Sequence, residues 1–205
     1  MMSKKPIIVF EGIEGSGKSH HILKVTKYLD KKKLSYLKLR EPGGSLSSEK
    51  IRRLMLNNKS IFNANTDLLL ILASRSENIK LLKKNYKKKI ILIDRFTDST
   101  IAYQHYGFGV NLKIIKLINN FLLKNIKVNF TFLNIVNKKN LFLRLNQRKS
   151  LNRYDKFNIN FYNKVQKGYL KLVKNKNKSY QIVDSNLNIK KNENLIISQI
   201  DKLIK

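Results

Sequence analysis

Residues 12–19 read Gly12-Ile13-Glu14-Gly15-Ser16-Gly17-Lys18-Ser19, which matches the pattern G-x-x-x-x-G-K-[ST] without a gap. A short apolar run at residues 6–10 precedes this stretch, and a helical pattern over about residues 18–33 follows it. Glycines let such a loop curl so that backbone N–H groups converge on phosphate oxygens, and the helix N-terminus adds partial positive charge. A chance glycine-rich turn would not require that strand or that helix. We therefore predict a P-loop in which Lys18 reaches the β- and γ-phosphates and the Ser19 hydroxyl binds Mg²⁺.

Strand patterns and helix patterns alternate outward from this stretch along the whole chain. The runs typical of strands are residues 6–10, 35–40, 90–93, 128–135 and 179–184. The helical patterns cover about residues 18–33, a segment from 47 onward, 67–84, 97–105, 111–125, 138–148, 157–175 and 189–204. This alternation predicts the α/β class, with a parallel sheet of five strands and helices on both faces. Because no internal repeat or long linker divides the chain, we expect residues 1–205 to form a single domain.

The composition excludes several classes of protein. Hydrophobic residues make up 42% of the 205, which is enough for a packed core and excludes an intrinsically disordered chain. The chain has no cysteine, so disulfides, Cys-ligated zinc and thiol catalysis are excluded. No apolar run approaches the ~18 residues of a membrane span, and residues 1–10 lack a secretory signal pattern. We expect a cytoplasmic protein without a membrane partner.

The charge is strongly positive, with 43 Lys and Arg against 13 Asp and Glu, or +30. Such a surplus is the usual footprint of nucleic-acid binding. Here it coincides with 35 Lys, 25 Asn and 24 Ile, all read from A/T-rich codons, and the lysines are spread over most segments. We therefore attribute most of the charge to composition. The arginines are more informative, because their planar fork suits phosphates and base edges; they are Arg40, Arg52, Arg53, Arg75, Arg95, Arg144, Arg148 and Arg153.

Two charged residues follow the third strand pattern. Asp94 ends the run at 90–93, so it is expected at the carboxyl edge of the sheet, where an acid can hold Mg²⁺ or its water shell. Arg95 comes next and would place a guanidinium beside the phosphates. The alternatives are an N-cap of the following helix for Asp94 and a structural salt bridge for Arg95.

Three segments occur in order and together resemble one known family. They are residues 11–19; Arg40-Glu41-Pro42-Gly43-Gly44; and Asp94-Arg95-Phe96-Thr97-Asp98-Ser99-Thr100-Ile101-Ala102-Tyr103-Gln104. At these spacings they resemble thymidylate kinase. The resemblance implies the P-loop kinase fold, transfer of the γ-phosphoryl group of ATP to dTMP with Mg²⁺ present, and a homodimer formed through helices beside the acceptor site. The chemistry suits the residues, because two polyanions must be brought together and the acceptor phosphate is itself the nucleophile.

The resemblance also implies roles for individual residues. Implied for ATP are Gly12, Ile13, Glu14, Gly15, Ser16, Gly17, Lys18, Ser19 and Arg144. Implied for dTMP are Glu11, Pro42, Arg52, Ile71, Arg75, Arg95, Ser99, Thr100, Tyr103 and Gln104. Implied for catalysis are Glu11, Lys18, Arg95, Arg148 and Arg153. Ser19 and Asp94 are implied for the metal. The alternatives are that Arg52 is a solvated arginine on a helix and that Tyr103 is a core residue.

A short lid at about residues 144–156 is expected to close over ATP and exclude water. One subgroup of the family carries its catalytic arginine in the P-loop, but the corresponding residue here is Gly15, so the lid must supply it. Arg148 and Arg153 are the candidates, and we favour Arg153 because it precedes Tyr154-Asp155 in a stretch resembling the family's D-R-x-E. Surface cations on a helix end are the alternative.

The sequence departs from the family pattern at four positions. Ile71 stands where the family usually stacks a Phe on thymine, which predicts weaker dTMP affinity. Asn152 and Asp155 replace the lid's Asp and Glu, and Phe96 replaces a Tyr or His.

Three other functions remain open from sequence. They are another nucleoside monophosphate or deoxynucleoside kinase, a nucleic-acid-binding P-loop ATPase, and an inactive scaffold. The ATPase does not account for the segments at 40–44 and 94–104, and the scaffold conflicts with the intact Lys18, Ser19, Asp94 and Arg95. We therefore expect the small molecules ATP and dTMP, and no nucleic acid, as partners.

Overall fold

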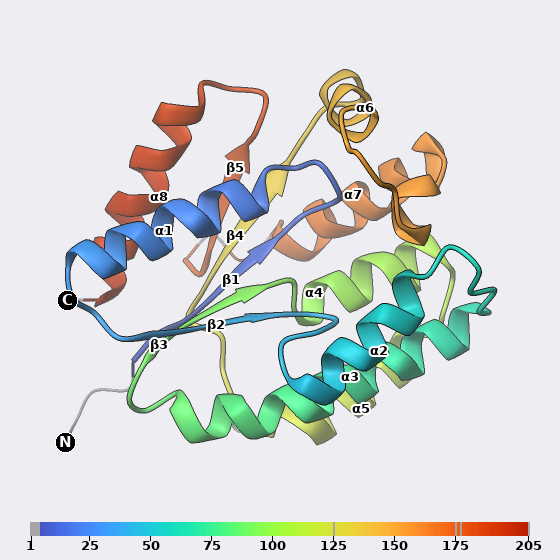
Figure 1. The fold of residues 1–205 in the computed structure, drawn as a ribbon, viewed down its shortest axis with the longest axis horizontal. Coiled ribbons are helices and arrows are strands. Elements are labelled where there is room, and N and C mark those ends of the chain that lie inside the picture. The colour runs from blue at the N-terminus through green and yellow to red at the C-terminus, as the bar shows by residue number, and fades with distance from the viewer. Residues whose placement is uncertain (1–4, 125, 175, 177, 205) are drawn as a thin grey trace.

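The sheet is parallel throughout and forms the centre of the fold (Figure 1). The computed structural model describes residues 5–124, 126–174, 176 and 178–204. The strands are β1 (Ile7–Glu11), β2 (Tyr36–Arg40), β3 (Ile90–Asp94), β4 (Phe130–Ile135) and β5 (Tyr180–Asp184), in the order β2-β3-β1-β4-β5. This confirms the predicted five-stranded α/β architecture.

The helices occur between the strands and after the last one. They are α1 (Lys18–Lys31), α2 (Leu46–Leu56), α3 (Ala64–Asn85), α4 (Thr97–Thr100), α5 (Leu112–Leu123), α6 (Lys138–Asn146), α7 (Ile159–Val173) and α8 (Ile189–Ile204). A π-helical segment, η1 (Ile101–Gly107), continues α4, and a single 3₁₀ turn, η2 (Arg153–Lys156), precedes α7. Among the helices of the described ranges, none combines the length and apolarity needed to cross a bilayer.

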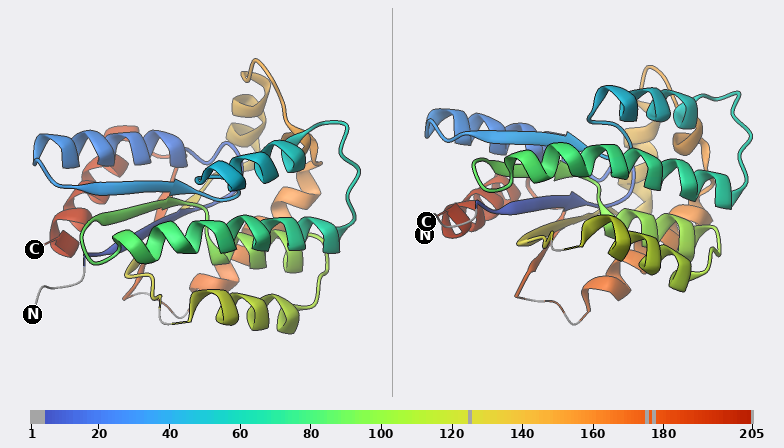
Figure 2. Two further views of the ribbon diagram at one scale, coloured as in Figure 1. Left: turned by 60° about the horizontal axis from the view of Figure 1, so that its bottom comes forward. Right: turned by 90° about the horizontal axis from the view of Figure 1, so that it is seen from below.

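Alternation along β1 explains why helices cover both faces of the sheet. All five residues of β1 are buried. Successive side chains of a strand point to opposite faces. Ile8 and Phe10 pack in one apolar cluster with side chains of α1 and α8, whereas Ile7 and Val9 pack in another with Leu82 of α3. Figure 2 shows the sheet between these helical layers. Because all the strands are parallel, the loops that follow them begin at the same edge of the sheet, its carboxyl edge.

The boundaries of two helical segments differ from the sequence prediction. The helix predicted to begin at Asp67 begins at Ala64, because the Asn63 side chain accepts a hydrogen bond from Thr66 N at 2.9 Å and caps it. Asp67 thus lies in the first turn. The helix predicted over 97–105 changes into the π-helix η1, for which no sequence pattern gave a signal. The ends of the helices predicted at 111–125 and 157–175 fall on residues outside those that the structure describes.

Candidate active site

A cavity of about 380 Å³ opens where β1, β2 and β3 end. In an open parallel sheet this carboxyl edge is where ligands bind. The predicted site residues that line it are Glu14, Gly15, Ser16, Gly17, Lys18, Ser19, Pro42, Arg52, Ile71, Arg75, Asp94, Arg95, Ser99, Thr100, Tyr103, Gln104, Arg144 and Arg148. Those that do not line it are Glu11, Gly12, Ile13 and Arg153. Six lining side chains are Lys or Arg and four are Asp or Glu, so the cavity suits polyanions.

The P-loop wraps around its own lysine. The Nζ atom of Lys18 donates to the carbonyls of Gly12 and Ile13, at 3.0 and 2.9 Å. Gly12 has a φ of 136°, and a Cβ there would lie 2.2 Å from the Asn134 carbonyl oxygen, so only glycine fits. Burial, together with the nearby guanidinium of Arg95, lowers the pKa of Lys18 to about 8. A phosphate anion beside this ammonium would favour its charged form.

Asp94 does not cap the helix that follows it, and one of its carboxylate oxygens has no partner. It pairs in register with Phe10 of β1, and its Oδ1 atom is buried without a hydrogen-bond partner. The N-cap of α4 is Phe96, which makes no side-chain capping bond, so the capping alternative is wrong. The described residues contain no group of three or more His, Cys, Asp and Glu arranged to hold a metal alone. A metal at Asp94 would therefore need further oxygens, from water or from a bound nucleotide.

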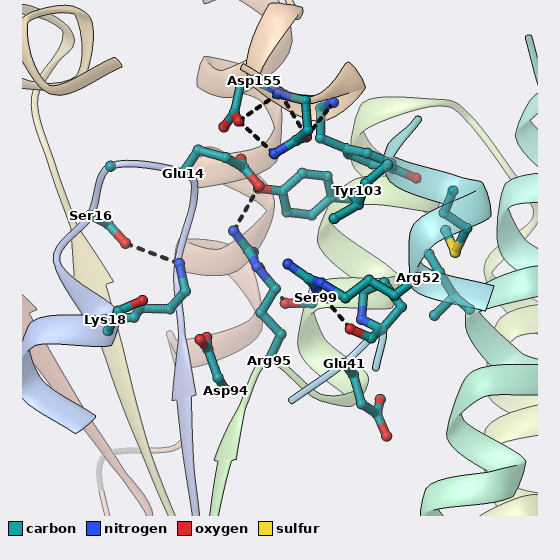
Figure 3. A pocket seen from close by; sticks show the side chains of 18 of the residues that line it. Glu14, Ser16, Lys18, Glu41, Arg52, Asp94, Arg95, Ser99, Tyr103 and Asp155 are labelled. Atoms are coloured by element: carbon teal, nitrogen blue, oxygen red, sulfur yellow. Dashed lines mark hydrogen bonds and ion pairs between the residues drawn. The ribbon is translucent and has the colours of Figure 1, made fainter. Parts of the chain in front are cut away.

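Arg95 lies at the centre of the cavity, with Lys18 and Asp94 on one side and Arg52 on the other (Figure 3). Its Nη1 atom donates to the Gly12 carbonyl at 2.7 Å, and its Nη2 atom lies 2.8 Å from the Glu14 carboxylate. The backbone of Arg95 has a φ of +66°, a conformation that costs a non-glycine residue about 1–3 kcal/mol. The structure thus holds this guanidinium between the two halves of the cavity.

Glu11 lies beneath the cavity instead of in it. Its side chain is only 1% exposed and accepts hydrogen bonds from Phe96 N at 2.9 Å and Ser99 N at 3.2 Å. It also accepts from the hydroxyls of Ser99 and Tyr169. Burial, together with the neighbouring Asp98, raises the pKa of Glu11 to about 7. This carboxyl group holds the turn after β3, so the position expected to face the acceptor is not exposed to it.

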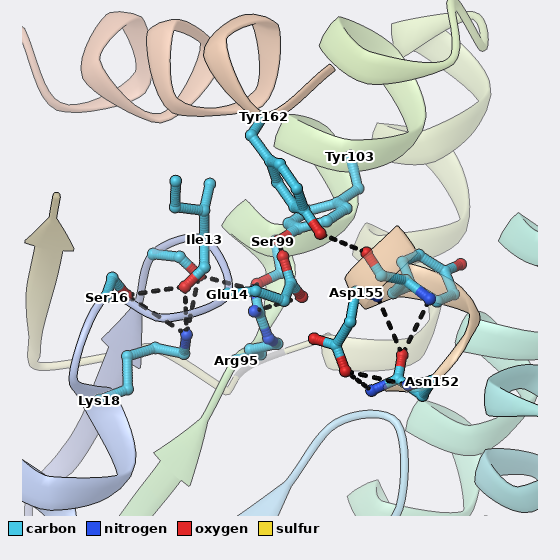
Figure 4. Close-up of polar contacts among 12 residues, drawn as sticks. Ile13, Glu14, Ser16, Lys18, Arg95, Ser99, Tyr103, Asn152, Asp155 and Tyr162 are labelled. Atoms are coloured by element: carbon cyan, nitrogen blue, oxygen red, sulfur yellow. Dashed lines mark hydrogen bonds and ion pairs between the residues drawn. The ribbon is translucent and has the colours of Figure 1, made fainter. Parts of the chain in front are cut away.

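The carboxylate that reaches the cavity near β1 is that of Glu14. Tyr103 donates its hydroxyl to Glu14, and the guanidinium of Arg95 contacts the other carboxylate oxygen (Figure 4). The resemblance assigned Glu11 to dTMP and catalysis and Glu14 to ATP, but of these two residues only Glu14 lines the cavity. Glu11 ends the buried strand β1, whereas Glu14 lies in the P-loop that follows, with a side chain that is 12% exposed.

A second set of polar side chains lies across the cavity on α3 and η1. Arg75 is fully buried; its Nε atom donates to Glu41 at 2.8 Å and its Nη2 atom to the Thr100 hydroxyl at 2.9 Å. Its remaining nitrogen, Nη1, donates to Asn119 of α5. Gln104 is buried as well, and both of its amide atoms lack a partner. These groups form a polar floor under the half of the cavity that Ile71 borders.

Four of these contacts involve residues that the sequence analysis gave no such role. They are Glu14, Glu41, Asn119 and Tyr169. Asn119 had a usable signal, because it is a polar residue one turn after the buried Ile115 on the buried side of α5. Glu14, Glu41 and Tyr169 had no such signal beyond their place in a motif or helix.

The arginines of the predicted lid separate into three positions. Arg144 donates to the carbonyls of Gly15 and Ser185, at 2.8 and 2.7 Å, and so braces the P-loop against the loop after β5. Arg148 lines the cavity and pairs with Asp155. Arg153, which sequence favoured as the catalytic arginine, instead pairs with Asp67 of α3 outside the cavity.

A P-loop that faces a second polar subsite across a central arginine defines a nucleotide kinase of the P-loop class. A family model described as thymidylate kinase matches residues 10–196. The thymidylate kinase of Mycoplasma capricolum is 39% identical over 187 residues, 89% of this chain and 88% of that protein. The enzyme of Kosmotoga olearia is 31% identical over 194 residues, 94% and 93% of the two chains.

The fold agrees with these matches. The crystal structure of thymidylate kinase from Ehrlichia chaffeensis aligns with a TM-score of 0.77 and 27% identity, covering 97% of this chain and 99% of that one. The chain belongs to the thymidylate kinase family.

Proposed function

We propose that the protein transfers the γ-phosphoryl group of ATP to dTMP, giving dTDP and ADP. The observation that carries this proposal is the buried pair Arg75 and Gln104 at one end of the cavity whose other end is the P-loop. A thymine edge offers carbonyl acceptors together with one N–H donor. The guanidinium supplies donors and the unpaired Gln104 amide supplies both kinds of partner. Membership of the family supports the same reaction.

The cations of the cavity fit the two phosphate groups of this reaction. Lys18 and the backbone of the P-loop would hold the ATP phosphates, with Arg144 behind them. Arg52, whose Nη1 donates to the Pro42 carbonyl at 2.7 Å, would grip the dTMP phosphate, and Arg95 would bridge the two. Together these cations would stabilise negative charge on the transferring phosphoryl group, and no proton transfer is needed.

The remaining acceptor contacts follow from the placements described above. Glu14 contacts both Arg95 and the Tyr103 hydroxyl, and we propose that the deoxyribose of a bound dTMP would sit beside this group. We therefore assign to Glu14 the sugar-side role that the sequence resemblance gave to Glu11. Thr100 and Ser99 border the same half of the cavity.

Mg²⁺ is the metal that we propose to accompany ATP. Ser19 follows the P-loop lysine and Asp94 presents an unpartnered, buried carboxylate oxygen, so both fit a hard cation that keeps several waters. When bound, Mg²⁺ neutralises charge on the β- and γ-phosphates.

The lid is proposed to comprise about residues 144–156 within a single domain of residues 1–205, and to supply the catalytic arginine. Gly15 in the P-loop leaves that role to the lid, and Arg148 is the lid arginine that lines the cavity beside Arg144. Arg148 pairs with Asp155, whose side chain is 1% exposed. When the lid closes over ATP, the guanidinium would exchange this carboxylate for a phosphate group.

The oligomeric state and the location of the protein are proposals as well. Leu69 of α3 and three residues of α5, Ile114, Leu117 and Phe121, are large apolar side chains between 48% and 70% exposed. Spacings of three and four place the α5 residues on one stripe. We propose that a second copy of this chain covers the stripe, giving a cytoplasmic homodimer.

A phosphorylation screen tests the proposed reaction. The purified protein would be incubated with ATP and Mg²⁺ and, separately, dTMP, dUMP, dCMP, dGMP, AMP or thymidine, with product measured by chromatography. We expect clear preference for dTMP. Preference for any other acceptor would overturn the assignment, and the Lys18→Ala variant in the same preparation controls for contaminating kinases.

A further inference from the structure

The predicted lid is fastened to the first turn of α3 by one buried carboxylate. Arg153 donates through Nη2 to both oxygens of Asp67, and the Tyr154 hydroxyl donates to Oδ2 at 3.0 Å. The Asp67 side chain is 2% exposed and that of Arg153 is 14% exposed. Arg153 and Asp67 are 86 residues apart in sequence. We call Asp67, Arg153 and Tyr154 the lid latch.

The segment before α3 adds further contacts to the lid latch. The guanidinium of Arg153 lies over the rings of Phe62 and Tyr154, 5.4 and 5.1 Å from their centroids. The Asn58 side-chain amide donates to the Leu151 carbonyl at 2.9 Å. Figure 2 shows the α2–α3 connection at this end of the molecule. The lid therefore rests on the acceptor side of the cavity rather than extending freely from the donor side.

The lid latch shares helix α3 with the base pocket, by which we mean Ile71 and the polar floor formed by Arg75, Thr100 and Gln104. Asp67, Ile71 and Arg75 are four residues apart, so they lie on one face of α3 at successive turns. Ile71 and Arg75 line the cavity in its acceptor half, and all three side chains are buried. A ligand that packs against Ile71 and Arg75 thus restrains the helix face that carries Asp67.

We propose that Asp67 is a positioning residue that couples occupancy of the acceptor site to closure of the lid over ATP. Opening the lid at this point removes both partners of a buried carboxylate, which is strongly unfavourable. An acceptor nucleotide that restrains α3 lowers the conformational entropy still to be lost when the lid orders. By linkage, each nucleotide then strengthens binding of the other by the same factor. This inference rests on the proposed function of the lid and of the base pocket.

The test measures that factor directly. Isothermal titration calorimetry would give the affinity of a non-hydrolysable ATP analogue with Mg²⁺, in the presence and absence of saturating dTMP. We expect the intact protein to bind the analogue at least about five-fold more tightly when dTMP is present, the lower end of typical allosteric coupling. In Asp67→Asn the factor should fall to about one, while dTMP affinity measured alone stays within two-fold. A factor of one in the intact protein, or an unchanged factor in the variant, would overturn the proposal.

Four further variants separate coupling from stability. Asp201→Asn removes a carboxylate that accepts a tyrosine hydroxyl, that of Tyr28 in α1, far from the cavity, and should leave the factor unchanged. Arg153→Gln and the double variant with Asp67→Asn should show the same loss as either single change, because the pair acts as one unit. If Asp67→Asn does not fold, Tyr154→Phe removes one hydrogen bond and should lower the factor partially; a full factor there contradicts the lid latch.

The two proposals fail in different ways. If the intact protein does not phosphorylate dTMP, the proposed function is wrong. If it does so while Asp67→Asn keeps the full coupling factor, only the lid latch is wrong.

Discussion

The guanidinium of Arg95 lies 2.8 Å from the carboxylate of Glu14, and this ion pair spans the boundary between the donor and acceptor halves of the cavity. A second nitrogen of the same guanidinium donates to the Gly12 carbonyl at 2.7 Å. A lysine at this position would have to make both contacts from a single nitrogen, without the planar fork that spaces the two donors apart. The acceptor phosphate would have to share this arginine with Glu14.

Arg95→Lys is therefore expected to lower kcat by about 10²-fold, in the range seen when one group that stabilises transition-state charge is removed. Steady-state kinetics with dTMP and ATP would measure the change. Arg53→Lys, at an exposed arginine without a proposed role, should keep full activity. Equal activity of the two variants would remove Arg95 from the reaction.

Lys18→Ala should abolish most of the activity and leave the fold intact. The ammonium bonds only to carbonyls of its own loop and, at 3.5 Å, to the Ser16 hydroxyl, so its loss disturbs local contacts. We expect a fall of at least about 10²-fold in kcat/KM for ATP, with a thermal midpoint close to that of the intact protein. Lys24→Ala, which breaks a surface pair with Glu193, is the matched control. A Lys18→Ala enzyme that turns over normally would contradict the P-loop assignment.

Arg148→Ala should lower kcat more than it raises the KM for dTMP. The reason is that a lid arginine that meets the phosphates only during transfer stabilises the transition state in preference to bound substrate. Initial-rate measurements over a range of both substrates would separate the two constants. An unchanged kcat would move the catalytic role away from Arg148.

Ile71→Phe should tighten dTMP binding. Ile71 borders the acceptor half of the cavity, where an aromatic ring could stack on the base, a contact of about 1–3 kcal/mol. We expect the Kd of dTMP to fall by about five-fold or more, which is the lower end of that range. Ile71→Leu keeps an aliphatic wall and should leave the Kd nearly unchanged. Equal affinity of Ile71→Phe and the intact protein would show that the site does not stack the base.

Glu11 should make stability depend on pH in a defined direction. Because burial and Asp98 raise its pKa in the folded state from 4.5 to about 7, the folded protein retains a proton that the unfolded chain has lost between these values. The stabilisation is complete below about pH 4.5 and is lost as the pH rises to about 7. Glu11→Gln, which stays neutral, should show a flatter profile of unfolding free energy over this range.

Urea denaturation at several pH values would measure that profile. Glu77→Gln, at an exposed position of α3, should follow the intact protein. Identical slopes for Glu11→Gln and the intact protein would mean that Glu11 titrates as it does in the unfolded chain.

Local patterns predicted most of the fold and most of the cavity. The strands could be predicted because buried runs such as Ile90-Ile91-Leu92-Ile93 are contiguous, and the P-loop because its residues are adjacent in sequence. The roles of Glu11 and Arg153 could not, because each depends on a partner far along the chain. Glu11 binds the turn at 96–99, and Arg153 binds a carboxylate 86 residues away. The π-helix η1 depends on packing, since Gly107 and Gly168 admit Phe161 and Tyr106 at distances that a Cβ would forbid.

Helix α3 restricts how the acceptor site can change during evolution. Asp67, Ile71, Arg75 and Asn78 lie along one rigid element, and Asn78 reaches the Gly43 carbonyl at 2.6 Å at its far end. A backbone shift that improved one of these contacts would displace the others, so a new acceptor specificity has to arise by replacing side chains at fixed positions. Position 71 allows a replacement of that kind, because the contacts of Asp67 one turn before it and of Arg75 one turn after it do not involve Ile71.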